Sequence, residues 1–354
     1  MVKRGSTYEN PGSGGNTLPP PGPALSSNAL PVAAFHVIKR YWGMTLNERT
    51  RVAVQRWGAV FTGLLAASLL AGCASREPAP EAAPGAKAPV LLKSVDLRLP
   101  LDTYLFSPSE QQRMEEARAA LDTTCMRRLG LDYDPGPVGP PLGPRSLMDR
   151  RYGVTDEAEA ASDGYHLGDR DPRTRTAPTR EPLTDAENSA LLGSSQGASA
   201  GDGASLPDGR PVPAGGCVGE STKALAGGGQ LGPTDPVRKA NAETFKSSMA
   251  DARVVKVFGA WSRCMEKRGH AYADPFAAMS ESRFQGAEPA PDEPEVAVAD
   301  VACKKRTNLV GTWFAVETAQ QEKLIARNRS TFDDALKSKK EQLSRAAEAL
   351  GNSR

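Results

Sequence analysis

The spacing of apolar residues along the chain predicts a mainly helical protein. Apolar side chains recur every three or four residues, the repeat of one helix face, in four segments: 107–130, 235–249, 254–269 and 293–350. No segment alternates apolar and polar residues as a half-buried strand does. We therefore expect a mainly α fold, a loop-rich helical domain with a long C-terminal helix.

Helix start and stop signals agree with this pattern. Ser107 with Glu110, and Thr184 with Glu187, have the spacing of capping boxes, which satisfy the first free N–H groups of a helix. Gly130 supplies a helix stop. The first of these helices places Cys125 on its buried face, in the last turn.

The segment 293–350 is predicted to be a very long helical stretch. Its first part directs apolar residues inward: Val296, Ala299, Cys303, Val310, Trp313 and Phe314. From Glu322 on it is dominated by charged and amide residues, with only a sparse apolar set: Leu324, Phe332, Leu336, Leu343 and Leu350. Such a thin apolar seam is typical of a projecting helix or of one that binds a partner.

An unbroken run of apolar and small residues, 57–73, has a different character. Arginines precede it, and it ends in Leu70, Ala71, Gly72 and Cys73. This is the order of a secretory signal, and the run is shorter than the about 20 residues of a spanning helix. The ending resembles the lipobox of bacterial lipoproteins, which implies cleavage before Cys73 and lipidation of its thiol. An uncleaved anchor, or a buried helix ending in an ordinary cysteine, is the alternative.

A lipobox would set the compartment and the domain order. Two acyl chains hold a protein on a membrane where one binds only marginally, so we expect a lipid anchor on the extracytoplasmic face of the cell membrane. Residues 44–72 are then the signal peptide, and residues 73–97 a Pro/Ala-rich tether. Residues 1–43 cannot form a core; they are a start-site artefact upstream of Met44 or a disordered cytoplasmic extension.

Charge and composition argue against a nucleic-acid partner. The formal net charge is +2 and only 6% of residues are aromatic. No basic stripe interleaved with aromatic residues is present, so the sequence has no electrostatic footprint for DNA or RNA.

Four cysteines remain after the lipobox: Cys125, Cys217, Cys264 and Cys303. An even number in an exported chain predicts two disulfides. Free buried thiols are the alternative. A zinc site is disfavoured because there is no Cys-x-x-Cys pair and histidines are few.

A repeated motif suggests how these cysteines pair. A Cys-Met pair at a helix end, then a glycine, a tyrosine and Asp-Pro, occurs at Cys125 and again at Cys264. One more cysteine follows each copy. Among three possible connectivities, a duplication favours Cys125–Cys217 and Cys264–Cys303, each stabilising by about 2–4 kcal/mol. Chance similarity is the alternative.

The repeat divides the exported chain into two helical modules, 98–232 and 233–354. Three motifs stand out: GGC at 215–217, AWSRCM at 260–265 and DVACKKRTNLVGTWFAVE at 300–317. With these motifs the sequence resembles uncharacterised secreted proteins and lipoproteins of high-GC Gram-positive bacteria. The resemblance implies no assigned activity and therefore no catalytic residues.

Motifs for catalysis or cofactor binding are weak. Residues 227–232 match GxGxxG, but no strand precedes them, so we interpret them as a linker. His270 could act as a base, although a histidine at a helix end is more often a solvated cap. His166 is the other histidine after the lipobox, and Trp261 and Trp313 are predicted core residues.

These observations predict a membrane-anchored envelope protein without enzymatic activity. It would bind a partner protein or the cell wall and would need no cofactor or metal. The alternative is a cell-wall-acting hydrolase that uses paired carboxylates, since carboxylates are plentiful in the chain.

Overall fold

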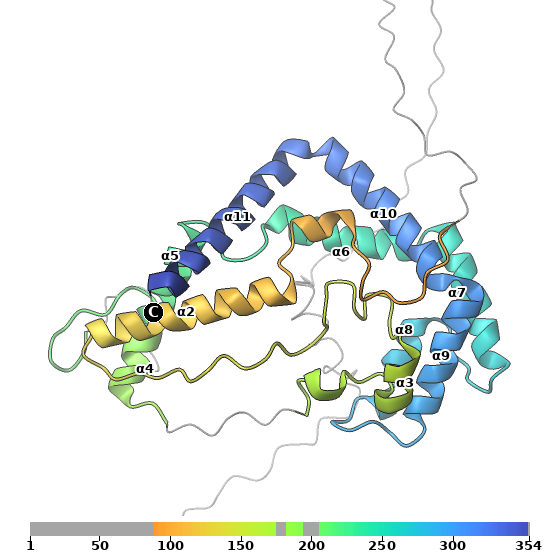
Figure 1. The fold of residues 1–354 in the computed structure, drawn as a ribbon, viewed down its shortest axis with the longest axis horizontal. Helices are drawn as coiled ribbons and strands as arrows, with labels where there is room; N and C mark the ends of the chain where they lie inside the picture. Colours follow the sequence, from red (N-terminus) through yellow and green to blue (C-terminus); the bar gives the residue numbers. More distant parts are fainter. Residues whose placement is uncertain (1–87, 175–181, 194–204, 353–354) are drawn as a thin grey trace, which may run out of the picture.

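The computed structural model describes residues 88–174, 182–193 and 205–352, and this part of the chain is mainly helical (Figure 1). The predicted signal peptide, its lipobox and the segment before it lie outside the described residues. Within the described ranges no β-sheet forms, and only isolated β-bridges occur. The helices are α2 (Pro108–Arg128), α3 (Glu157–Asp163), α4 (Asp185–Leu192), α5 (Gly216–Ala226), α6 (Asp235–Met249), α7 (Ala252–Glu266), α8 (Pro275–Met279), α9 (Glu293–Thr307), α10 (Leu309–Arg327) and α11 (Arg329–Asn352), with 3-10 turns η1 (Pro100–Thr103), η2 (Gly168–Arg170) and η3 (Ser282–Phe284).

The predicted capping boxes are confirmed. The Ser107 hydroxyl accepts the Glu110 N–H at 3.2 Å, and the Glu110 carboxylate accepts the Ser107 N–H at 2.8 Å. The same reciprocal pair begins α4 at Thr184. Because both signals are local, they act in the same way whatever the tertiary fold.

The helices gather into two ends joined by a middle layer (Figure 1). α2, α4 and α5 pack together at one end, and α3, α7, α8 and α9 lie at the other. Helices α6, α10 and α11 connect the ends, because α11 packs along α2 while α10 packs on α6 and α7.

Each end contains one of the predicted disulfides. Cys125 pairs with Cys217 and Cys264 with Cys303, at Cα–Cα distances of 5.5 and 5.7 Å. The first disulfide belongs to a small core between α2, α4 and α5, and the second to the main core of the molecule.

The two halves of the repeated motif adopt the same backbone geometry. The N–H of Leu131 donates to the carbonyl of Met126, and that of His270 to Met265, both at 3.0 Å. The glycine just before each donor is left-handed, with φ of +67° and +89°. These bonds close the helix ends α2 and α7 in the same way.

The predicted long C-terminal helix is confirmed, since α11 spans 24 residues. The helical stretch expected over 293–350 is divided, however, into three helices, α9, α10 and α11. The first break is at Asn308, which takes a left-handed φ of +51°. Asparagine tolerates this conformation better than most residues. The second break is at Asn328, whose side chain donates to the carbonyl of Leu324 at 2.9 Å.

The expectation that the last part of this segment projects from the fold is wrong. α11 folds back on α2, α5 and α6. Phe332, Ala335 and Ala346 are buried there, at 2%, 4% and 0% exposure. Of the predicted seam, Phe332 is buried and the four leucines are half-buried, so α11 packs against the chain instead of projecting.

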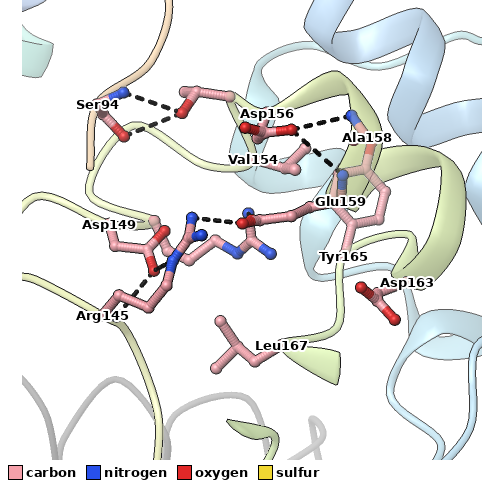
Figure 2. Close-up of polar contacts among 12 residues, drawn as sticks. Ser94, Arg145, Asp149, Val154, Asp156, Ala158, Glu159, Asp163, Tyr165 and Leu167 are labelled. Carbon is pink, nitrogen blue, oxygen red and sulfur yellow. Dashed lines mark hydrogen bonds and ion pairs between the residues drawn. The ribbon is translucent and has the colours of Figure 1, made fainter. Parts of the chain in front are cut away.

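The tether predicted for residues 73–97 is too long, because residues 89–97 dock on the folded domain. The Asn308 side chain accepts the Leu91 N–H at 3.2 Å and donates to the Pro89 carbonyl at 3.0 Å. Ser94 is fully buried and bonds to Thr155 at 3.1 Å through both its N–H and its hydroxyl (Figure 2). We call residues 89–97 the docked arm.

A glycine makes room for this arm. A Cβ at Gly311, inside α10, would lie 1.8 Å from the Pro89 carbonyl oxygen. Any side chain there would displace the arm, which accounts for a glycine within a helix where alanine would be favoured.

Candidate ligand pocket and the buried network behind it

A cavity of about 380 Å³ lies between η1, the start of α2, residues 142–151 and the first turns of α6. Its volume is in the roughly 300–1,000 Å³ range of small-molecule sites. Much of its wall is apolar, formed by Leu105, Phe106, Leu142 and Leu147 together with prolines. We call this cavity the α2–α6 pocket.

One edge of the α2–α6 pocket is polar and comes from α6. Arg238 and Asn241 are three residues apart, so they share one face of the helix. Asn241 is only 8% exposed, and its side-chain amide has no hydrogen-bond partner within the described residues. Because Asn241 lines the cavity, this amide is available to hydrogen-bond to a ligand there.

The opposite wall adds a second amide. Gln111 on α2 donates from its side-chain nitrogen to the Phe106 carbonyl at 2.9 Å. Its carbonyl oxygen accepts no hydrogen bond from the described residues. Two amides therefore border the pocket across its apolar interior.

Arg150, in the back wall, has a strained backbone. Its φ is +67°, and it lies in a turn closed by the Gly153 N–H donating to the Arg150 carbonyl at 3.1 Å. Such a conformation in a residue other than glycine costs about 1–3 kcal/mol. The guanidinium anchors the turn by pairing with Glu159 at 3.2 Å and donating to the His166 carbonyl at 2.9 Å.

A buried ion pair fixes the next residue of that wall. Arg151 is 2% exposed and its Nε donates to Glu317 at 3.0 Å, while Tyr152 donates to the same carboxylate at 2.9 Å. Burial by itself would lower the pKa of Arg151, but the charge of Glu317 outweighs it and raises that pKa. Burial and Glu317 together raise the pKa of Tyr152 well above its usual value.

A second buried ion pair holds Val154, which follows the turn. Lys304 pairs with Asp300 at 2.8 Å and donates to the Val154 carbonyl at 2.8 Å, while Trp261 donates to Asp300 at 2.8 Å. Burial lowers the pKa of Lys304 and raises that of Asp300. The absence of a side chain at Gly153 leaves space for the ammonium, which would lie 2.6 Å from a Cβ there.

A third cluster surrounds His166, which is 2% exposed. Its Nδ1 lies 3.4 Å from Asp171 and its Nε2 lies 3.4 Å from Glu293. Despite burial, hydrogen bonds from Arg173 lower the pKa of Asp171 to about 2. These two carboxylates converge, as a hydrolase would need, but both are buried against a histidine and neither lines the α2–α6 pocket.

A further ion-pair cluster lies next to the pocket. Arg145 lies between Asp149 and Glu159, and its Nε is 3.2 Å from the Asp149 carboxylate (Figure 2). Asp149 is therefore the one carboxylate that lines the pocket, and it is already paired.

The residues singled out from the sequence lie away from this pocket. Cys73 and the lipobox residues Leu70, Ala71 and Gly72 are outside the described residues, and the four remaining cysteines form the disulfides. Residues 227–232 form the loop between α5 and α6, which agrees with their interpretation as a linker.

Other predicted residues have structural or peripheral positions. Trp261 and Trp313 are both fully buried, as predicted for the core. His270 lies after α7 and lines a shallow, open hollow with Arg268 and Glu295. The sequence reasoning missed Arg238, Asn241 and Gln111, because an amide or arginine on a helix is usually a solvated residue and no spacing distinguishes these.

Within the described residues, no cluster of histidine, cysteine or acidic side chains could hold a metal ion, and no helix is long and apolar enough to cross a membrane. Comparisons of the chain with protein-family models, with curated proteins and with solved structures find no match.

Proposed function

We propose that this protein is a lipid-anchored, extracytoplasmic binding protein that holds a small ligand in the α2–α6 pocket without transforming it. The observation that carries the proposal is a largely apolar cavity of about 380 Å³ lined by the Asn241 side chain, whose amide makes no hydrogen bond within the described residues. Apolar walls with a few directed polar groups are the usual make-up of a small-molecule site.

The anchoring half of the proposal rests on the sequence and on the disulfides. Two disulfides fit an oxidising compartment outside the cytoplasm. Metabolic labelling with an alkyne-bearing fatty acid should label the wild-type chain, and Cys73→Ser should lose both the label and membrane association. A mature chain that still carries Trp57, or reduced thiols in the cytosol, would contradict it.

Photocrosslinking in intact cells tests the binding half. A photoreactive amino acid is placed at Leu142, which lines the pocket and is 36% exposed, and in a control chain at Leu192, which is 55% exposed at the end of α4. We expect an adduct of small-molecule mass at position 142 only. The same adducts at both positions, or only protein-sized adducts at 142, would refute a small-ligand pocket.

A further inference from the structure

The volume of the α2–α6 pocket and the apolar, polar and charged residues that line it indicate the class of ligand that it binds. We infer that the α2–α6 pocket takes a small amphipathic anion, with an apolar body and a carboxylate or phosphate head. This inference rests on the proposed binding function and specifies its ligand class.

The size of the ligand follows from the volume. An apolar cavity of roughly 150 Å³ holds one benzene molecule, so about 380 Å³ accommodates a body of about 12 to 15 non-hydrogen atoms. Leu105, Phe106, Leu142 and Leu147 come from two sides of the cavity and would bury an alkyl or aryl body between them.

The head group would bind at the polar edge of α6. The Asn241 amide has two N–H donors and is more than nine-tenths buried. Arg238, on the same helix face, is 33% exposed at its side chain. Its guanidinium donates to the Pro233 carbonyl and to Asp235, and also to the Gln230 side-chain oxygen in the amide orientation that satisfies both groups. Its partner Asp235 is 76% exposed, so that ion pair is weak and leaves much of the positive charge of Arg238 uncompensated beside the pocket.

The charge around the pocket favours an anion over a cation. Arg150, Arg151 and Arg238 are lining residues, whereas the carboxylates paired with them, Glu159, Glu317 and Asp235, are not. The one lining carboxylate, Asp149, already accepts the Arg145 backbone N–H at 2.8 Å and its side chain at 3.2 Å.

The helix ends add to this polarity. α2 begins at Pro108 and α6 begins two residues after Pro233, and both prolines line the pocket. The N-terminal end of a helix carries about half a positive charge. The start of α6 therefore adds positive potential beside Arg238 and Asn241 at the polar edge, and the start of α2 adds it on the other side of the pocket.

Equilibrium dialysis of the full chain in lipid nanodiscs tests the inference, with empty nanodiscs subtracted. The probes are octanoate, octyl phosphate, octan-1-ol and octylammonium, which share one apolar body and differ in the head. We expect saturable binding of octanoate, octyl phosphate or both, and the tighter of the two identifies the head group. Octanol should bind at least about tenfold more weakly, because a hydrogen bond to a charged group contributes more than one between neutral groups.

Two charge variants locate the head group. Arg238→Gln should weaken octanoate binding about tenfold and leave octanol unchanged. Lys239→Gln makes the same charge change on the next residue, which is 75% exposed, and should alter neither. Asn241→Asp should abolish anion binding and allow octylammonium to bind, with near-ultraviolet circular dichroism confirming that the fold is kept.

The outcomes separate the two proposals. If octanol or octylammonium binds as tightly as the anions, or if Arg238→Gln behaves like Lys239→Gln, the pocket binds ligands but the anion inference is wrong. If none of the four probes binds, the inference is overturned and the proposed binding function loses its main support.

Discussion

Arg151→Met should destabilise the protein far more than the loss of an exposed ion pair would. Arg151 and Glu317 are 2% and 0% exposed at their side chains, so removing the guanidinium leaves a buried carboxylate with only Tyr152 at 2.9 Å and Gln321 at 3.4 Å as donors. Breaking a buried pair on one side costs about 3–5 kcal/mol, because the remaining charge is uncompensated.

An exposed arginine–glutamate ion pair serves as the control for the buried one. Arg128 and Glu220 lie 2.6 Å apart at 57% and 40% exposure, and such pairs contribute about 0.2–1 kcal/mol. Arg128→Met should therefore lower the free energy of unfolding by no more than about 1 kcal/mol. Urea denaturation at pH 7, followed by circular dichroism, measures both variants.

The double variant Arg151→Met with Glu317→Leu makes the test sharper. Removing both charges leaves no uncompensated charge at this site, so most of the stability lost in Arg151→Met should return. The reasoning is refuted if Arg151→Met costs no more than Arg128→Met, or if the double variant is as unstable as the single one.

Three further predictions follow from other parts of the fold. Gly311→Ala should displace the docked arm and expose residues 89–97 to limited proteolysis, whereas Gly259→Ala, whose Cβ would meet its nearest atom at 3.5 Å, should leave proteolysis unchanged. The Asp171 pKa of about 2 lies below its ordinary 3.8, so the stability that it contributes is present above about pH 4 and is lost as the pH falls towards 2. Asp171→Asn should thus be less stable than wild type by about 2 kcal/mol at pH 6, with the gap in urea-unfolding free energy closing near pH 2. Replacing either disulfide by two alanines should lower the free energy of unfolding by about 4 kcal/mol in the same assay. The loss should be slightly larger for the disulfide that spans 92 residues than for the one that spans 39. Equal stability with and without the disulfides would contradict this.

The pocket could not be predicted from the sequence, although most helices could. Ser107 and Thr184 mark helix starts through contacts three residues away, and such local contacts are readable in the chain. Asn241 is different, because it matters only once residues 105–111 and 142–151 enclose a cavity beside its face of α6. A missing hydrogen bond leaves no trace in residue spacing.

The breaks between α9, α10 and α11 could not be predicted from the sequence either. Asn308 is an unremarkable residue in a helical pattern, yet its left-handed conformation turns the chain and its side chain holds Pro89 and Leu91 of the docked arm. That arm precedes Asn308 by more than 200 residues, so no window of the sequence contains both partners. The sequence also showed the apolar residues of α11. It could not show that they pack on α2, which precedes α11 by about as many residues as the docked arm precedes Asn308.

The sequence by itself determined the mainly helical class, the caps of α2 and α4, the two buried tryptophans and the pairing of the cysteines. Each of these depends on short-range periodicity or on a motif repeated within the chain. Only the tertiary structure decided that residues 150–154 enter the core, that α11 is covered, and that Arg238, Asn241 and Gln111 border one cavity. Burial and charge pairing depend on which distant segments exclude water together, and that is a property of the packed chain.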